Sequence, residues 1–477
     1  MAVPVLLWGQ APCGTDAAAQ RSWLARYTAH LRQPAPAIRD LRQVPVAFHL
    51  VGRSNGAGRV AVGRVLDLLC ELNTTYAPVG MWFYLAEDGI GLPDDDGVFT
   101  QPLLATSRQR MRSWRQDSAL NVYVVSQAGS AGVLGYYDAQ DDWVVVRRDA
   151  IRPDAQTLAH EIGHFFSLLH PHFGWDGAAW QAQIHGNPAP ALASDLLTPT
   201  ERMDSSNCDT AADMLCDTRP DYNFGLGWQQ NCAYAGGALD PDSVLVDPDE
   251  TLVMSYFGDA CRGTFSPQQI ALMQSDWADP ARAYLHRAAA PLVDTLAGVP
   301  LPVAPVGTGG VSGGALSFVW RAVAGATGYW VECDRSPSFD LDPTTALVAD
   351  TSATLTADWQ FATTYYWRVR AFSTAYTCAA PATPSNFVPA QALALGDAAT
   401  RPRIEATADP LVFFLQLPYP APHPLTCELT DLAGRVCWRQ SLAAAQARHR
   451  IALPSLPPGS YVLCIDRWPS VLLRVQR

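Results

Sequence analysis

The chain has 477 residues and a formal net charge of −12, and 48% of its residues are hydrophobic and 10% aromatic. This length exceeds one ordinary hydrophobic core, so we expect two to four domains. The apolar content excludes a generally disordered chain. The acidic balance argues against a nucleic-acid partner, which would need a basic face. No apolar run approaches the roughly 18–20 residues of a membrane helix.

The first eleven residues, MAVPVLLWGQA, are apolar. We interpret residues 1–11 as the end of a secretory signal whose start is truncated, because the basic region that opens a signal is missing. A plain apolar leader is the alternative. Residues 12–42 are polar, with a helical pattern that ends in a Pro-Ala-Pro stretch. We expect these residues to form a separate segment before the main domain.

From residue 44 onward the chain alternates predicted strands and helices. Residues 44–51 (VPVAFHLV) resemble a buried strand, and residues 60–72 have the pattern of an amphipathic helix. Further strands are expected at residues 81–86, 120–126 and 143–147, and a further helix at residues 157–169. The pattern predicts an α+β domain over residues 44–290, with a mixed twisted sheet and helices packed on it.

A Pro/Gly-rich stretch over residues 291–314 predicts a linker. Two all-β modules are expected after it. Residues 315–393 alternate strands with aromatic anchors such as Trp320, and residues 402–477 alternate short strands with Pro/Gly turns. We therefore expect two C-terminal β-sandwich modules.

The stretch HEIGHFFSLLH, which begins at His160, has the spacing of a metal site. Residues four apart share one face of a helix, so His160 and His164 can bind one metal ion. Glu161 lies beside them, where it can take a proton from a water that zinc acidifies to a pKa of about 7. Ten residues of straight helix would carry His170 about 15 Å away, so the helix must end near Ser167 for His170 to be the third ligand.

This stretch and the later sequence Val-Met-Ser-Tyr resemble the metzincin pattern HExxHxxGxxH with its Met-turn. The chain is similar in particular to the pappalysin family of metzincin zinc metalloproteases. The matching residues cover roughly half of the chain and run through HEIGHFFSLLH, SNCDTAADMLCDTRPD, NCAYAGGALDPD and LVMSYFGDACRGTFSPQQIALM.

The resemblance implies that Met254 packs beneath the three imidazoles and that Tyr256 stabilises the oxyanion formed during hydrolysis. Plain core packing is the alternative for Tyr256. The family usually has Gly where this chain has Ser167, and a left-handed serine costs on the order of 1–2 kcal/mol. His172 is a competing metal ligand, but only His170 has the family offset.

The segment DMLCDT resembles the family segment that wraps a structural calcium ion. The resemblance implies that Asp213, Thr218 and main-chain carbonyls supply the oxygen ligands. A turn closed by the aspartate side chain without a metal is the alternative.

Four cysteines, Cys208, Cys216, Cys232 and Cys261, lie close together in the sequence without the spacing of a zinc knuckle. Disulfides in an oxidising compartment are the favoured interpretation, and free thiols in a cytosolic protein are the alternative. The resemblance suggests that Cys208 pairs with Cys232 and Cys216 with Cys261, although four cysteines allow three connectivities.

Cys13-Gly14-Thr15 resembles a family pro-segment signature. The resemblance implies that residues 12–43 are a pro-segment, in which the Cys13 thiolate occupies the water position on zinc and keeps the enzyme latent. Residues 12 to about 42 would then be removed on activation. An unpaired cysteine in a flexible tail is the alternative.

The two β modules carry resemblances of their own. Residues 315–393 are similar to a fibronectin type III module. Residues 402–477 are similar to the C-terminal sorting domain of type IX secretion substrates, which implies the type IX secretion machinery as a partner and an outer-membrane or extracellular location. The matching pieces of this sorting domain include Asp431-Leu-Ala-Gly-Arg435.

The sequence therefore predicts a secreted zinc metalloendopeptidase that hydrolyses peptide bonds of extracellular proteins, with Glu161 as general base. An extended peptide substrate is expected against the edge strand of the sheet, at residues 143–147 or the neighbouring strand. The alternative is a non-catalytic cell-surface adhesin that keeps a metzincin scaffold. The intact Glu161 favours the enzyme.

Overall fold

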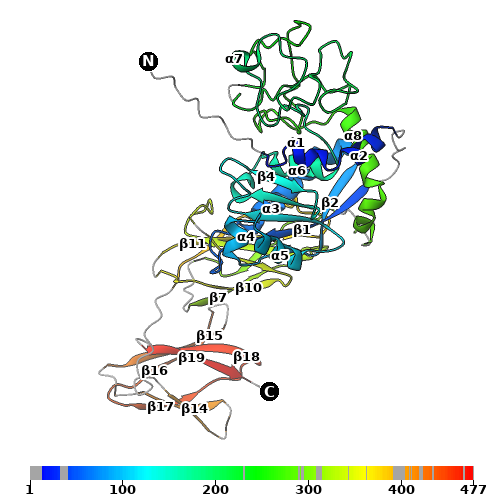
Figure 1. Ribbon diagram of the computed structural model, residues 1–477. Coiled ribbons are helices and arrows are strands. Elements are labelled where there is room, and N and C mark those ends of the chain that lie inside the picture. The colour runs from blue at the N-terminus through cyan, green and yellow to red at the C-terminus, as the bar shows by residue number, and fades with distance from the viewer. Residues whose placement is uncertain are drawn as a thin grey trace, which may run out of the picture. The chain divides into compact units, whose positions relative to one another are not determined.

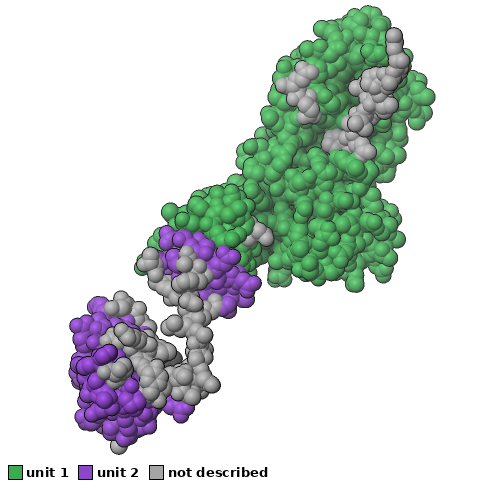
Figure 2. All heavy atoms as spheres, turned by 90° about the vertical axis from the view of Figure 1, so that its left-hand side faces the viewer, with its two compact units in different colours: residues 1–305, 317–355, 366–385 green, residues 306–316, 356–365, 386–477 purple. Residues whose placement is uncertain are grey.

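The structure is a computed structural model that describes residues 13–32, 41–228, 231–287, 291, 295–307, 314–341, 343–360, 363–389, 403–407, 409, 411–417, 420, 423–431, 435–465 and 468–475. The predicted signal remnant, residues 1–11, lies outside them. Figure 2 colours two compact units: residues 1–305, 317–355 and 366–385 form unit 1, and residues 306–316, 356–365 and 386–477 form unit 2. The domain boundaries expected from the sequence stay predictions.

Unit 1 contains all the helices that the structure describes. The α-helices are α1 (Ala17–Arg21), α2 (Leu24–Leu31), α3 (Val62–Tyr76), α4 (Asp96–Thr100), α5 (Ala105–Trp114), α6 (Thr157–Phe165), α7 (Ala182–His185) and α8 (Pro267–Trp277). The 3-10 helices are η1 (Ala77–Val79), η2 (Arg148–Ala150) and η3 (Pro280–His286).

The first five strands form one mixed sheet in the order β2-β1-β3-β5-β4. They are β1 (Arg42–Leu50), β2 (Met81–Gly91), β3 (Leu120–Val125), β4 (Gly135–Asp138) and β5 (Trp143–Arg147). Strand β1 pairs in parallel with β2 and β3, and β3 with β5, whereas β4 is antiparallel to β5. The predicted mixed sheet is confirmed, and β4 is one of its two edges.

Side chains that alternate along the strands fill two apolar layers, one on each face of the sheet. On one face, Val44, Val46 and Phe48 belong to the main core, together with residues of α3 and α6. On the other face, where Figure 1 shows α4 and α5, Tyr123 and Trp143 belong to a second apolar cluster with residues of these two helices. Helix α6 therefore packs on the face of the sheet that carries the main core.

The N-terminal segment is packed against this main core. The helical pattern expected over residues 12–42 is confirmed in α1 and α2, and α2 lies beside α8 (Figure 1). Trp23 and Tyr27 are buried members of the main core. Helix α8 begins with a capping box at Ser266, which fixes its start.

Between α6 and α8 the described chain is mostly irregular and is held by turns and two disulfides. Cys208 bonds to Cys216 and Cys232 bonds to Cys261, with Cα separations of 5.0 and 5.3 Å. The expected pairing of Cys208 with Cys232 and of Cys216 with Cys261 is therefore wrong. The physical reason is local, because consecutive turns over residues 205–214 fold the chain back on itself and bring two cysteines only 8 residues apart within bonding distance.

The remaining strands form four antiparallel sheets in the orders β10-β7-β6, β12-β11-β8-β9, β13-β14-β17 and β16-β15-β18-β19. The first seven of these strands are β6 (Pro302–Ala304), β7 (Ala315–Trp320), β8 (Gly328–Asp334), β9 (Thr344–Val348), β10 (Ser352–Thr356), β11 (Tyr365–Phe372) and β12 (Ser385–Phe387). The others are β13 (Arg403–Ala406), β14 (Val412–Gln416), β15 (Leu425–Asp431), β16 (Val436–Leu442), β17 (Arg448–Ala452), β18 (Gly459–Ile465) and β19 (Trp468–Val475). An all-β C-terminal half is confirmed for the described residues, whereas its division into two sandwich modules stays a prediction.

A third disulfide, Cys70–Cys378, joins α3 to the chain that follows β11. The sequence reasoning did not identify it, because these two cysteines are 308 residues apart. None of the helices that the structure describes has both the length and the apolar content needed to cross a membrane.

Candidate metal centre

Helix α6 carries His160, Glu161 and His164 and ends one residue after His164. Two residues beyond its end, Ser167 has a φ of 70°, which is a left-handed conformation that turns the chain out of the helix. The predicted helix end near Ser167 is confirmed. The turn brings His170 back toward the helix.

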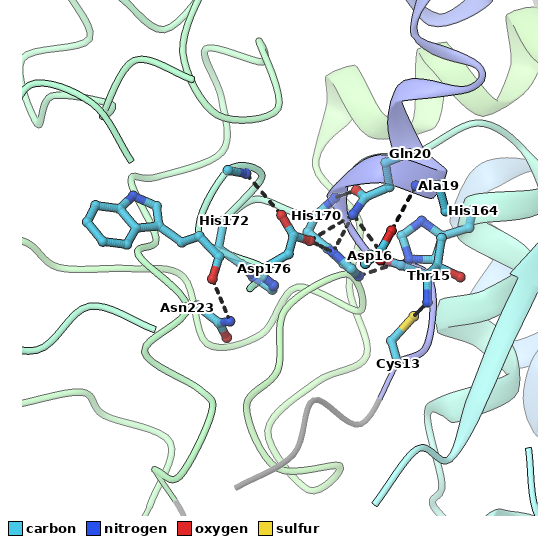
Figure 3. A network of polar contacts seen from close by, with 12 residues as sticks. Cys13, Thr15, Asp16, Ala19, Gln20, His164, His170, His172, Asp176 and Asn223 are labelled. Atoms are coloured by element: carbon cyan, nitrogen blue, oxygen red, sulfur yellow. Dashed lines mark hydrogen bonds and ion pairs between the residues drawn. The ribbon is translucent and has the colours of Figure 1, made fainter. Parts of the chain in front are cut away.

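The three imidazoles meet at their Nε2 atoms. The Nε2 atom of His170 lies 3.1 Å from Nε2 of His160 and 2.9 Å from Nε2 of His164. All three side chains are buried, and Figure 3 shows His164 and His170 turned toward each other. The structure thus brings together the three residues that the sequence named as ligands.

The Nδ1 atoms of the three imidazoles all face an oxygen acceptor outside this cluster. The pairs are His160 with the Val253 carbonyl at 2.9 Å, His164 with the Leu168 carbonyl at 2.8 Å, and His170 with the Asp176 carboxylate. A proton held at Nδ1 leaves the Nε2 lone pair free for a metal. Burial lowers the pKa of all three rings, that of His164 to about 4, which favours the neutral form that metals bind.

Glu161 and Cys13 are buried beside the histidine cluster. The Cys13 thiol donates to Glu161 Oε2 over 3.4 Å, and the Cys13 sulfur belongs with the three histidines to one group of atoms that could hold a metal ion. Glu161 Oε1 is buried without a hydrogen-bond partner among the described residues. Burial raises the pKa of Glu161 to about 8, while the contact with Cys13 and the charge of Arg262 act in the opposite direction.

The described N-terminal segment occupies the edge strand next to the cluster. Cys13 forms a parallel bridge with Gly135 of β4, and the Gly14 N–H donates to the Gly135 carbonyl over 2.8 Å. The Thr15 hydroxyl accepts a backbone N–H of the same strand over 2.9 Å. Of the two strands considered for peptide binding, residues 143–147 (β5) lie inside the sheet, so the neighbouring β4 is the edge.

Gln20 and Asp176 support His170 from the side away from the cluster. Gln20 Nε2 lies 2.9 Å from His170 Nδ1 and donates to Asp176 Oδ1 over 2.7 Å, and Gln20 Oε1 accepts the His170 N–H over 2.9 Å. Figure 3 shows Gln20 reaching down from α1 to this pair. Neither residue was identified from the sequence, because a glutamine 150 positions away from a histidine gives no local signal of the contact.

Met254 lies directly beside α6. It is fully buried, and a Cβ added at Gly163 would lie 2.3 Å from Met254 Sδ, so the helix has no room for a side chain there. Tyr256 follows two residues later, and its buried ring makes an edge contact with the His170 ring at a centroid distance of 4.9 Å. Met254 therefore packs against α6 and Tyr256 against an imidazole, whereas their roles beneath the metal and at the oxyanion stay predictions.

His172 lies next to the cluster without sharing its Nε2 contacts. Its ring stacks on His170 at a centroid distance of 4.6 Å and an interplanar angle of 9°. A second group of atoms that could hold a metal contains His170, His172 and Asp176. Since His170 is the residue whose Nε2 contacts both helix histidines, we take it rather than His172 as the third nitrogen donor.

The segment predicted to wrap calcium contains buried carboxylates without cationic partners. Thr218 Oγ1 donates to Asp213 Oδ1 over 2.9 Å. Asp213 Oδ2 and Glu201 Oε2 are buried and have no hydrogen-bond partner among the described residues. Burial, with the nearby charges of Asp213 and Asp221, raises the pKa of Glu201 to about 10, and burial raises that of Asp213 to about 7. Glu201 lies outside the segment that the sequence named, but its carboxyl is close enough to feel the charge of Asp213.

No protein-family model matches the chain. The sequence is similar to an extracellular metalloprotease of Verticillium alfalfae, with 24% identity over 269 residues that cover 49% of this chain and 76% of that protein. Among solved structures, a promirolysin mutant from Tannerella forsythia has a TM-score of 0.38 and 15% identity over 57% of this chain and 96% of that chain. The fn3 domain of human contactin 1 has a TM-score of 0.18 and 18% identity, and covers 23% of this chain and 93% of its own. The sequence similarity relates about half of this chain to an extracellular metalloprotease.

Proposed function

We propose that the chain is a secreted zinc endopeptidase of the pappalysin type, held here in its latent form. The observation that carries the proposal is the convergence of three neutral imidazole Nε2 atoms next to the Glu161 carboxyl. The similarity to an extracellular metalloprotease supports it. The disulfides of the described chain also suit a protein of an oxidising compartment.

The residues of the cluster fit zinc by the chemistry of their donors. Three imidazole nitrogens with acceptors on their second nitrogens are the ligand set of many catalytic zinc sites, which leave one position for water or substrate. His160, His164 and His170 would hold the ion. When bound, zinc would supply a Lewis acid that polarises the scissile carbonyl and promotes the ionisation of a water molecule.

Glu161 would take one proton from the attacking water, whose oxygen forms the new bond to the scissile carbonyl carbon. When the bond between carbon and nitrogen breaks, Glu161 returns this proton to the leaving amine. Its burial and its free Oε1 suit a carboxyl that exchanges a proton near neutral pH. Tyr256 would donate its phenolic hydrogen to the developing oxyanion. The burial that raises the pKa of Tyr256 keeps this donor protonated.

The latent state would follow from the N-terminal segment. The Cys13 sulfur belongs with the three histidines to one group of possible metal ligands. The Gly14 N–H occupies a backbone carbonyl of β4 that an extended peptide substrate would use. We propose that residues 12–43 act as the pro-segment and that the Cys13 thiolate would occupy the fourth zinc position.

A structural calcium ion is also part of the proposal. Buried carboxylate oxygens of Glu201 and Asp213 without partners need a cation or protons to offset their desolvation. Asp213, Thr218 and Glu201, together with main-chain carbonyls, would hold it. Attachment through a type IX sorting domain at residues 402–477 stays a prediction.

The experiment that tests the proposed function takes the full chain with Cys13→Ala as the parent, because this change removes the thiol next to the histidine cluster, and compares it with the same chain carrying Glu161→Gln as well. We expect the parent to bind one zinc ion, to cleave casein or gelatin, and to lose cleavage on treatment with a zinc chelator. Glu161→Gln should keep the zinc, measured by elemental analysis, and lose cleavage by at least about a thousandfold. Cleavage that survives in Glu161→Gln, or zinc bound with no turnover of any protein, would reject the proposal.

A further inference from the structure

The small cavity beside Glu161 contains a buried guanidinium that the proposed chemistry does not use. The lining residues are Cys13, Thr157, His160, Glu161, Tyr256 and Arg262. His160 and Glu161 belong to the proposed reaction centre, so a side chain that fills this cavity lies next to the bond being cleaved. Arg262 is the basic residue of this lining and is therefore the group that can select such a side chain by charge.

Arg262 is held in place by the backbone around Met254. Its Nη1 donates to the carbonyls of Val253 and Ser255, at 3.1 Å in each case, and its Nη2 donates to Asp259 Oδ1 over 2.6 Å. Only 8% of the Arg262 side chain is exposed. Its Nε atom is buried and has no hydrogen-bond partner among the described residues. The guanidinium is therefore fixed in place and keeps its Nε–H available for a ligand.

The charges around this guanidinium leave an excess of positive charge. Asp259 is the acidic partner of Arg262, but its second oxygen accepts a hydrogen bond from Arg152. Two arginines thus share one carboxylate. The side chain of Arg152 is 53% exposed, so water screens its charge, whereas Arg262 is almost completely enclosed.

The other charged groups near the cavity do not cancel this excess. The Asp259 carboxylate also accepts a hydrogen bond from the N–H of Gln156, at the start of α6, over 3.3 Å. Thr157, the first residue of α6, lines the cavity, so the positive end of the helix dipole adds to the potential. Glu161 lines the same cavity and is negatively charged as the proposed base, but zinc bound at the three histidines would outweigh this charge with its double positive charge.

We infer that Arg262 makes this cavity a subsite for an acidic side chain, so that the enzyme cleaves next to aspartate or glutamate. This inference rests on the proposed function and names its substrate class. The substrate carboxylate would accept from the free Nε–H and displace nothing that Arg262 already binds. In the described state the Cys13 side chain lines the same cavity and takes up part of its space.

The test uses the full chain with Cys13→Ala, so that the thiol does not block the cavity. A diverse peptide library is digested, and the residues on both sides of each cleaved bond are identified by mass spectrometry. We expect Asp and Glu to be enriched about tenfold over Asn and Gln at one of these two positions, which corresponds to one charge-assisted hydrogen bond.

Three further variants in the same background assign the preference to Arg262. Arg262→Met keeps the length without the charge and should reduce the enrichment to less than about twofold, whereas Arg262→Lys should keep it. Arg152→Gln is the matched control, because it contacts the same carboxylate from outside the cavity, and it should behave like the parent.

The Cys13→Ala chain alone also tests the acidic preference, even if Arg262→Met fails to fold. For two peptides that differ only by Glu or Gln at the selected position, kcat/KM should be about tenfold higher for Glu. Cleavage without any acidic preference, or a preference that survives in folded Arg262→Met, would overturn the inference and leave the proposed function intact. No cleavage of any peptide by the parent would reject the proposed function and the inference with it.

Discussion

Gly225 lies directly against the backbone that carries Tyr256. A Cβ added at residue 225 would lie 2.3 Å from the Tyr256 carbonyl carbon and 2.3 Å from the Phe257 nitrogen. These are backbone atoms, which cannot move aside as a flexible side chain can. The absence of a side chain at Gly225 therefore allows two segments that are distant in sequence to meet, and it sets the position of Tyr256 against the imidazoles.

We predict that Gly225→Ala displaces Tyr256. Overpacking of this kind costs about 1–3 kcal/mol, which should appear as a lower urea midpoint of unfolding. The kcat should fall more than the affinity for zinc, because Tyr256 is proposed to act on the oxyanion and not on the metal.

Gly258→Ala is the matched control for this prediction. Residue 258 is close to Tyr256 in sequence, its φ lies outside the left-handed range, and a Cβ there would have no neighbour within 4 Å. If both variants keep parental kcat and midpoint, the close approach at Gly225 does not hold Tyr256 in place.

The candidate site divides into residues that the sequence could reveal and residues that it could not. His160, Glu161 and His164 are predictable because a helix fixes their relative positions within four residues. Ser167 could also be placed, since geometry alone required the helix to end there. Arg262 and Gly225 act through contacts between distant loops, and no local pattern reports which loops will meet.

At the scale of elements, the N-terminal helices differ from an ordinary removable tail. Trp23 is 4% exposed and Tyr27 is 0% exposed, and both belong to the main core. Trp23 Nε1 donates to the Ser167 carbonyl over 3.0 Å, and Arg26 pairs with Asp276 of α8 at 3.1 Å. Movement of Cys13 alone would open the metal centre, whereas removal of α2 would expose core surface.

We predict that Cys13→Ala raises the activity of the uncleaved chain. If the thiolate stabilises the latent state by about 1.4 kcal/mol or more, its loss should raise the activity at least about tenfold. The activity is measured as the initial rate of cleavage of a quenched fluorescent peptide. Cys437→Ala is the matched control, since Cys437 is another free cysteine but is exposed. Equal rates for the unmodified chain and Cys13→Ala would show that this thiol does not cause latency.

The irregular region between α6 and α8 should depend on calcium. We predict that a calcium-selective chelator lowers the unfolding temperature of the protein and that added calcium restores it. The stabilisation is about 2.7 kcal/mol when calcium is at a hundred times its Kd.

The combined change of Glu201→Gln and Asp213→Asn should abolish this calcium response. Asp209→Asn, at an exposed position in the same region, should leave the response unchanged. A parent whose unfolding temperature ignores both chelator and calcium would contradict the proposed ion, and the buried carboxyls would then be held protonated.

Helices and strands could be predicted from the sequence, whereas the disulfide pairing suggested by the resemblance was wrong. Strand and helix positions follow from periodicity, and the segment expected at residues 143–147 is β5. Disulfide connectivity does not follow from periodicity. The turns that join Cys208 to Cys216 depend on backbone conformations that residue types alone do not specify, and the long-range Cys70–Cys378 bond depends on how β-strands pack on α3.

For the molecule as a whole, residues 317–385 belong largely to the same compact unit as the metal centre. The Leu85 N–H donates to the Thr374 carbonyl over 2.8 Å, and Trp82 Nε1 donates to the Ala375 carbonyl over 2.9 Å. The segment after β11 therefore covers part of β2, the sheet edge opposite β4. A covered edge limits unwanted strand pairing and leaves β4 as the place where a peptide can add.

The Cys70–Cys378 disulfide should contribute more to the stability of this unit than either of the other two bonds. It closes a separation of 308 residues, against 29 for Cys232–Cys261. In the chain-entropy model, this difference favours the longer closure by about 2 kcal/mol, within a usual range of about 2–5 kcal/mol for one bond. The paired change of Cys70→Ala and Cys378→Ala should therefore lower the urea midpoint of unfolding more than the paired change of Cys232→Ala and Cys261→Ala. Equal midpoints for the two double variants would mean that residual structure already keeps α3 and the strands around β11 close together in the unfolded chain, so that the covalent bond adds little.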